Sequence, residues 1–226
     1  MKLPRHSLYV LILLGLFLAW WAVLAIHPLD RSDWMLENAL AVTAIGVLAV
    51  TSRWFRFSRF SYTLIFLFLC VHEVGAHYTY AKVPYQAWLH ALGGPLQSLG
   101  TGRNHFDRLA HFSFGLLLSY PMREVFVRIA QARGFWSYYL PLDMTMAFSM
   151  IFELIEWAAA TVFGGDLGVA YLGTQGDPWD AQKDMALASL GGLIAMIVTA
   201  LVNLHQDRDF AREWIESLHV KPTRRR

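Results

Sequence analysis

The sequence predicts an all-α fold in which six transmembrane helices form one bundle within a single integral membrane domain. The first observation is compositional: 56% of the 226 residues are hydrophobic and 16% are charged, whereas about 25% of the residues of a soluble domain are charged. The second is that the apolar residues gather into segments close to the roughly 20 residues that cross a bilayer. The third is that Lys and Arg gather on one side of these segments.

The same composition excludes several classes of protein. A chain so rich in apolar residues is neither disordered nor a coiled coil. A formal net charge of +2 indicates no nucleic-acid partner. The one cysteine, Cys70, excludes an intramolecular disulfide and is expected to be a small buried apolar residue. The composition therefore favours the lipid bilayer as the partner.

The first predicted helix covers residues 8–26, which are 19 residues without a charge. Lys2 and Arg5 precede this segment, as they would in a signal peptide. The apolar stretch is longer than the 7–15 residues usual in a signal peptide, however, and no small-residue cleavage site follows it. We therefore expect an uncleaved transmembrane helix.

Five further segments are each expected to cross the membrane once. Hydropathy alone predicts the first and last of the six, whereas the segments between them carry ionisable residues, which usually face a bundle interior or a water-filled cavity. The five segments cover approximately residues 34–51, 60–80, 108–127, 140–163 and 183–204.

The positive charges support six crossings with both termini in the cytoplasm. If the N-terminus lies inside, 14 of the 19 Lys and Arg residues fall on the cytoplasmic side and five fall outside, as the positive-inside rule requires. The final Arg224–Arg226 run is then expected to anchor the chain near anionic lipid.

This topology brings polar residues of four segments to the outer half of the membrane. In chain order they are His72, Glu73 and His77; Arg103, Asn104, Asp107 and His111; Glu153 and Glu156; and Gln175, Asp177, Asp180 and Asp184. Spacings of three or four residues, as in Asp107 and His111, place side chains on one helix face. The depths of these residues in the membrane, calculated from a helix rise of about 1.5 Å per residue, overlap. We therefore expect that they share one cavity.

The charge of this cluster predicts a bound cation or protons. Seven carboxylates face three cations, Arg103, Arg108 and Lys183, which leaves an excess of four negative charges; desolvation of like charges favours protonation, a divalent metal ion or a cationic ligand. The expected metal ligands are His77, Asp107, Glu156, Asp180 and Asp184. The expected catalytic residues are Glu73, His111 and Glu153, and the expected substrate-binding residues are Arg103, Asn104, Gln175 and Asp177.

Simpler interpretations stand beside these roles. Asp107 and Asp180 can be helix N-caps, and Glu156 can be a solvated residue near the interface beside Trp157. The sequence from His72 to His77 is not the HExxH zinc motif, because its second histidine comes one residue too late. The histidines His27, His90 and His105 are expected to be neutral and hydrogen-bonded. The apolar stretch 87–92, within the 81–102 loop, is either a flap over the cavity or a plain connector.

Four motifs resemble the YjdF-type bacterial inner-membrane proteins, a family of unknown function. They are His72-Glu73-x-Gly-Ala-His77-Tyr-Thr-Tyr, Arg103-Asn-x-x-Asp107-Arg-x-x-His111-Phe, Glu153-x-x-Glu156-Trp and Gly173-Thr-Gln-Gly-Asp177-x-Trp-Asp180-x-x-x-Asp184-Met. The resemblance implies a multi-pass inner-membrane topology and no particular reaction. A looser similarity links the chain to VanZ-like membrane proteins, associated with glycopeptide-antibiotic tolerance, in which a Gln stands where this chain has Glu156.

Three functions follow from these observations. The first is a metal-dependent hydrolase or transferase that acts on an envelope lipid or lipid-linked substrate, because carboxylates with histidine can hold a divalent metal ion and activate water. The second is a non-catalytic stress or ligand-binding protein whose polar cluster locks the bundle. The third is a proton- or cation-coupled transporter, although inverted repeats are not evident and the cytoplasmic half offers few matching polar residues, chiefly Glu124 and Asp143.

Overall fold

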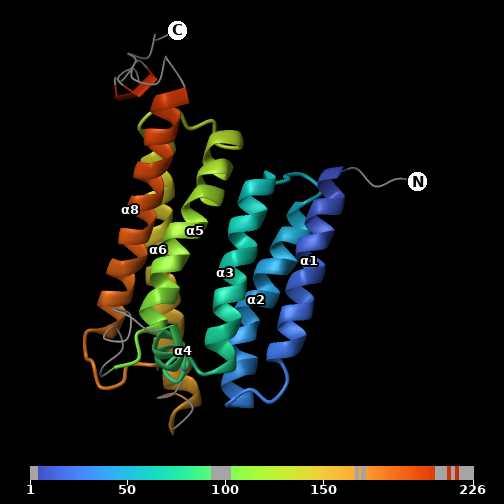
Figure 1. Ribbon diagram of the computed structural model, residues 1–226. Helices are drawn as coiled ribbons and strands as arrows, with labels where there is room; N and C mark the ends of the chain where they lie inside the picture. The colour runs from blue at the N-terminus through green and yellow to red at the C-terminus, as the bar shows by residue number, and fades with distance from the viewer. Residues whose placement is uncertain are drawn as a thin grey trace.

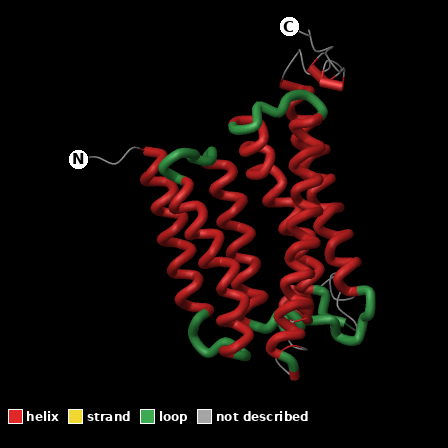
Figure 2. Tube along the Cα trace, turned by 180° about the vertical axis from the view of Figure 1, so that it is seen from behind, coloured by secondary structure: helices red, strands yellow, loops and turns green. Residues whose placement is uncertain are grey.

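The computed structural model describes residues 5–92, 103–165, 168, 172–206, 213–214 and 217–218, and their regular secondary structure is helical (Figures 1 and 2). The basic run at 224–226, Lys2 and the part of the predicted loop at 93–102 lie outside the described residues. The helices are α1 (Arg5–Leu24), α2 (Arg31–Thr51), α3 (Arg59–His77), α4 (Tyr85–Leu92), α5 (Phe106–Arg128), α6 (Trp136–Phe163) and α8 (Asp180–Gln206).

Five of these helices are long and apolar enough to cross a membrane: α1, α2, α3, α6 and α8. The predicted all-α membrane fold is confirmed to this extent. Helix α5 has 23 residues, but charged residues stand at both of its ends, from Asp107 and Arg108 to Arg123, Glu124 and Arg128. Its central residues 112–122 carry no charge. A sixth crossing and cytoplasmic termini therefore stay predictions.

The observed helices begin one to four residues before the predicted apolar segments, because polar residues at their starts are part of the helix. The Asp30 side chain caps α2 by accepting hydrogen bonds from the backbone N–H groups of Ser32 and Asp33, and Ser58 caps α3 in the same way through Ser61. The prediction that the third helix continues to residue 80 is wrong. It ends at His77, since Thr79 and Tyr80 have positive φ angles of 57° and 46°.

The two halves of the bundle are α1–α3 and α5, α6 and α8 (Figure 1). Helix α3 packs on both α1 and α5 and so links the halves. The start of α1 and the end of α8 lie at the same end of the bundle (Figure 2). At the opposite end, α3 and α6 finish while α5 and α8 begin, and we call this the polar end. The short helix α4 also lies there (Figure 1).

Glycines allow α5 and α8 to pack closely along much of their length. A Cβ atom added at Gly115 would lie 1.9 Å from the Ala188 carbonyl oxygen, and one added at Gly191 would lie 2.2 Å from that of Phe112. Small residues at membrane helix interfaces bring backbones together in this way. The close approach fixes how the first turns of α5 face those of α8.

We expect Gly115→Ala to lower the free energy of unfolding by about 1–3 kcal/mol, because the added methyl group overpacks the α5–α8 interface. Thermal unfolding of the purified protein in detergent measures the change. Gly46→Ala in α2 is the matched control, since a Cβ there meets no atom within 4 Å. Equal stability of the two variants would contradict the packing argument.

Candidate functional site

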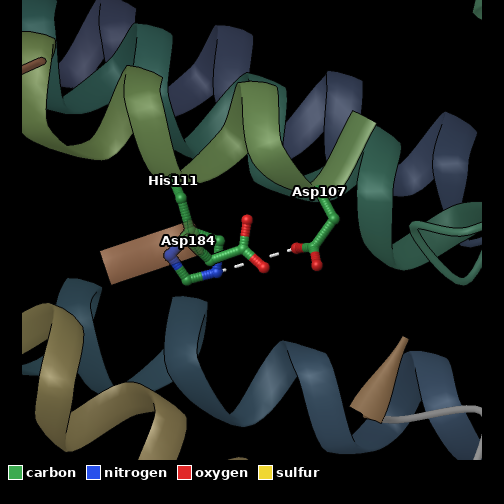
Figure 3. A group of neighbouring side chains, drawn as sticks. All are labelled: Asp107, His111 and Asp184. Atoms are coloured by element: carbon green, nitrogen blue, oxygen red, sulfur yellow. Dashed lines mark ion pairs between the residues drawn. The ribbon is translucent and has the colours of Figure 1, made fainter. Parts of the chain in front are cut away.

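Three side chains at the polar end converge as a possible metal centre. Asp107 and His111 lie one turn apart on α5, and Asp184 reaches them from α8 (Figure 3). Each offers one ligand atom, and these atoms all lie within 4.8 Å of one another. All three residues are buried, with exposed fractions of 9%, 7% and 2% in that order. Asp107 and His111, which are four residues apart on α5, therefore lie on the same helix face, as the sequence predicted (Figure 3).

Glu153 of α6 adds a fourth polar group. Its Oε1 atom lies 3.4 Å from Nε2 of His111, which is itself 3.7 Å from Oδ1 of Asp107. The Oε1 atom of Glu153 and the Oδ1 atom of Asp184 are buried and have no hydrogen-bond partner among the described residues. A buried oxygen without a partner is costly, so these oxygens favour a proton, a water molecule or a cation beside them.

The geometry is close to what a metal ion needs. Carboxylate and imidazole ligands lie about 2.0–2.2 Å from a zinc ion, so neighbouring ligands of a tetrahedral ion lie about 3.3–3.6 Å apart. The three ligand atoms, which lie within 4.8 Å of one another, would therefore move inward by on the order of 1 Å to bind one ion. Imidazole with carboxylates suits zinc, iron or manganese. The donor set thus fits a divalent metal ion with open positions.

Ion pairs beside this group join residues around the start of α5 to residues around the start of α8. We call these paired residues the mouth of the site. Arg108 contacts Asp177 at 2.7 Å and Asp180 at 3.3 Å, Arg103 also pairs with Asp180, and Lys183 contacts Asp177 at 2.6 Å. Both carboxylate oxygens of Asp180 thus face guanidinium groups. The structure therefore places Asp180 outside the metal group, as a counter-ion of the arginines.

Arg103, Asn104 and Gln175 join the segment before α5 to the segment before α8. The backbone N–H of Asn104 donates to the Gln175 side chain at 3.0 Å, and the Gln175 amide donates back to the Asn104 carbonyl at 2.9 Å. Arg103 donates to the carbonyl oxygens of Gly173 and Thr174. These predicted substrate-binding residues are thus engaged in holding the two segments together.

The ion pairs also set the charge states at the mouth. The Lys183 ammonium, with the Trp179 backbone N–H, lowers the pKa of Asp177 to about 2. Partial burial, with Arg108 and Arg103 nearby, lowers the pKa of His105. His105 is accordingly neutral near pH 7, as the sequence predicted, and its Nδ1 atom accepts a hydrogen bond from Arg108 at 3.3 Å.

The capping interpretation does not describe Asp107 or Asp180. The residue before α5 is His105, which makes no side-chain cap, and Asp107 is the second helical residue. Asp180 is the first residue of α8 and binds arginines through its side chain. Asp177 fills a local role instead, since its Oδ1 atom accepts the Trp179 backbone N–H at 3.1 Å.

Two predicted residues of α3 lie apart from the metal group. His77 is half-buried, and its Nδ1 atom donates to the Leu24 carbonyl at 2.7 Å, which ties α3 to the end of α1. Glu73 is fully buried. The Asn38 side chain interacts with it, but neither carboxylate oxygen has a partner in ordinary hydrogen-bond geometry among the described residues.

Two carboxylates that the sequence reasoning missed also reach the polar end. Asp33 and Glu37 lie one turn apart on α2 and are 1% and 3% exposed. With Glu156 and Asp107 they line a second, small cavity. Their i, i+4 spacing near the start of an apolar segment was the available signal, and it matches that of Asp107 and His111.

Comparison with known proteins agrees with this membrane architecture. The profile of a family described as "Predicted membrane protein (DUF2238)" matches residues 9–205. The chain is 38% identical over 183 residues to the inner membrane protein YjdF of Escherichia coli strain K12. The aligned region covers 80% of this chain and 84% of that protein. The resemblance to YjdF-type proteins is thus confirmed, and that to VanZ-like proteins stays a prediction. No solved structure matches the chain.

We expect Asp177→Asn to lower the midpoint of thermal unfolding at pH 7, because it removes the ion pairs to Arg108 and Lys183. The pKa of Asp177 is about 2, below its ordinary 3.8, so this stabilisation is complete above pH 3.8 and disappears as the pH falls through about 2. Unfolding midpoints of both proteins across this range test the linkage. A difference that is absent at pH 7, or that persists at the lowest pH, would contradict it.

Proposed function

The chain belongs to the DUF2238 family of predicted membrane proteins, and from this premise we propose that it is a multi-pass inner-membrane hydrolase or transferase that uses a divalent metal ion. We infer a single membrane domain with the polar end facing outward and an envelope lipid or lipid-linked molecule as substrate. The observation that carries the proposal is the convergence of Asp107, His111 and Asp184, with Glu153 beside them.

Each residue of the group has a defined role in this proposal. Asp107, His111 and Asp184 hold the metal ion, which when bound supplies Lewis acidity and acidifies a coordinated water molecule. The Oε1 atom of Glu153 lies 3.4 Å from Nε2 of His111 and has no hydrogen bond in ordinary geometry to a described residue, so Glu153 would accept the proton as general base. Glu73, the other base that the sequence suggested, lies outside this group.

The surroundings of the group favour a lipid substrate. Trp157 near the end of α6 and Trp179 just before α8 are each 64% exposed at the polar end. Exposed tryptophans at helix ends sit at the headgroup level of a bilayer. The outward faces of α6, with Leu154, Ile155 and Val162, are apolar and exposed. A lipid headgroup would thus lie at the depth of the mouth.

The arginines contribute to this site as structural ion pairs. Arg103 and Arg108 are bound to Asp177 and Asp180, and within the described part of the chain their Nε atoms are buried without a hydrogen-bond partner. A phosphate or carboxylate of the substrate would therefore compete with these aspartates. A metal ion, if held by Asp107, His111 and Asp184, would supply another place for such a group to bind.

The alternative functions are less well supported. A purely structural network is expected to satisfy its buried polar groups, whereas Glu153 and Asp184 each retain an oxygen without a hydrogen-bond partner among the described residues. A transporter also needs polar groups toward the end of the bundle that is opposite the polar end. On that side, Glu124 is bound by Ser58, Ser61 and Arg128, and Asp143 is exposed on α6.

We predict that the purified protein retains on the order of one zinc, iron or manganese ion per chain. His111→Ala and Asp184→Asn should each lower metal content at least about tenfold, and Glu153→Gln should retain it, since Glu153 is placed as a base. Elemental analysis by mass spectrometry measures this. Asp143→Asn, which removes an exposed carboxylate elsewhere on α6, is the control.

Catalysis is tested with the same variants on lipid extracted from the host membrane, with product detected by mass spectrometry. Glu153→Gln should lower turnover by about 10²–10⁴ while keeping its metal ion. A wild-type protein without metal, or a Glu153→Gln variant with undiminished turnover, would contradict the proposal.

A further inference from the structure

A second buried cavity at the polar end lies between the two halves of the bundle. It has room for about one water molecule or ion. Four carboxylates line it from three helices: Asp33 and Glu37 of α2, Asp107 of α5 and Glu156 of α6. Thr79, Tyr80 and Gly173 complete the lining. The only residue that it shares with the metal group described above is Asp107.

Two of the residues that line the cavity carry carboxylate oxygens that no described residue satisfies. The Oδ1 atom of Asp33 and the Oε2 atom of Glu37 are buried and have no hydrogen-bond partner among the described residues. Both residues are at least 97% buried. Such oxygens are costly unless a ligand binds them, so they point to an occupant that offers positive charge.

Hydrogen bonding also makes Tyr80 an acceptor toward this cavity. The Nε2 atom of His72 lies 3.2 Å from the backbone carbonyl of Glu37, which can only accept, so Nε2 carries the ring hydrogen. The Nδ1 atom of neutral His72 is then an acceptor and takes the hydroxyl hydrogen of Tyr80 at 2.5 Å. The phenolic oxygen of Tyr80 therefore has only lone pairs left.

We propose that this cavity binds a single calcium-like divalent cation through the carboxylates of Asp33, Glu37, Asp107 and Glu156. Only oxygen donors among its lining side chains face it, and hard cations such as calcium prefer all-oxygen sites. Magnesium usually retains several water molecules, for which this cavity lacks space. A transition metal would instead favour the nearby group that contains His111.

Such an ion would join the two halves of the bundle at the polar end. Asp33 and Glu37 come from the α1–α3 half, whereas Asp107 and Glu156 come from the other half. Elsewhere the halves are linked through the packing of α3 on α5. The ion would also bind Asp107, which the second cavity shares with the metal group. This inference does not depend on the proposed function.

The test is calcium titration of the full-length protein in detergent after treatment with a chelator. Isothermal titration calorimetry with calcium chloride should show on the order of one site per chain. Glu37→Gln and Asp33→Asn should each weaken calcium binding at least about tenfold. His111→Ala and the control Asp143→Asn should bind calcium within about twofold of the wild type. Size-exclusion chromatography checks the folding of each variant, and Asp33→Asn serves if Glu37→Gln does not fold.

The outcomes separate this site from the metal centre. Absence of calcium binding to the wild type, or unchanged binding in both α2 variants, would overturn the second site. Loss of calcium binding in His111→Ala would overturn it as well, because the ion would then belong to the other group. Calcium binding that depends on Glu37 in a protein without transition metal would support it and would contradict only the proposed function.

Discussion

The burial of carboxylates within an apolar bundle is the constraint on which the polar end of this protein depends. A charge moved out of water loses solvation that its surroundings must replace. At the mouth, Arg103, Arg108 and Lys183 replace it for Asp177 and Asp180. Deeper in the bundle, Asp184 and Glu37 form no ion pair with Lys or Arg among the described residues, and their unpartnered oxygens are candidates for protons or metal ions.

The fold provides the precision that such a site requires. Helices α5 and α8 approach closely through Gly115 and Gly191, and this packing sets the first turns of the two helices against each other. Asp107 and His111 consequently face Asp184 across a short gap (Figure 3). The Asn104–Gln175 hydrogen bonds hold the preceding segments in place. A metal site built on packed helices is more precise than one built on loops.

Much of this arrangement could be predicted because it depends on local spacing. The lengths of the apolar segments identify the helices, and the i, i+4 spacing places Asp107 and His111 on one face. The sorting of charges along the chain predicts that four helices share a polar end.

The rest depends on how each helix is rotated about its axis, which spacing does not define. His77 shares a helix face with Glu73, yet it bonds to Leu24 because that part of α3 meets the end of α1. Asp180 lies one helical turn before Asp184 and could share its face, but its carboxylate pairs with Arg103 and Arg108 instead. Asp33 was missed because it stands just before an apolar segment, where the observed α2 has already begun.

Binding of one metal ion by His111 and two carboxylates underlies the proposed chemistry. Pulsed electron paramagnetic resonance of the manganese-loaded protein tests it directly, because a bound imidazole nitrogen couples to the electron spin of the metal ion. We expect a nitrogen coupling in the wild type that disappears in His111→Ala and persists in His77→Ala. A spectrum without nitrogen coupling, or a coupling that survives in His111→Ala, would contradict it.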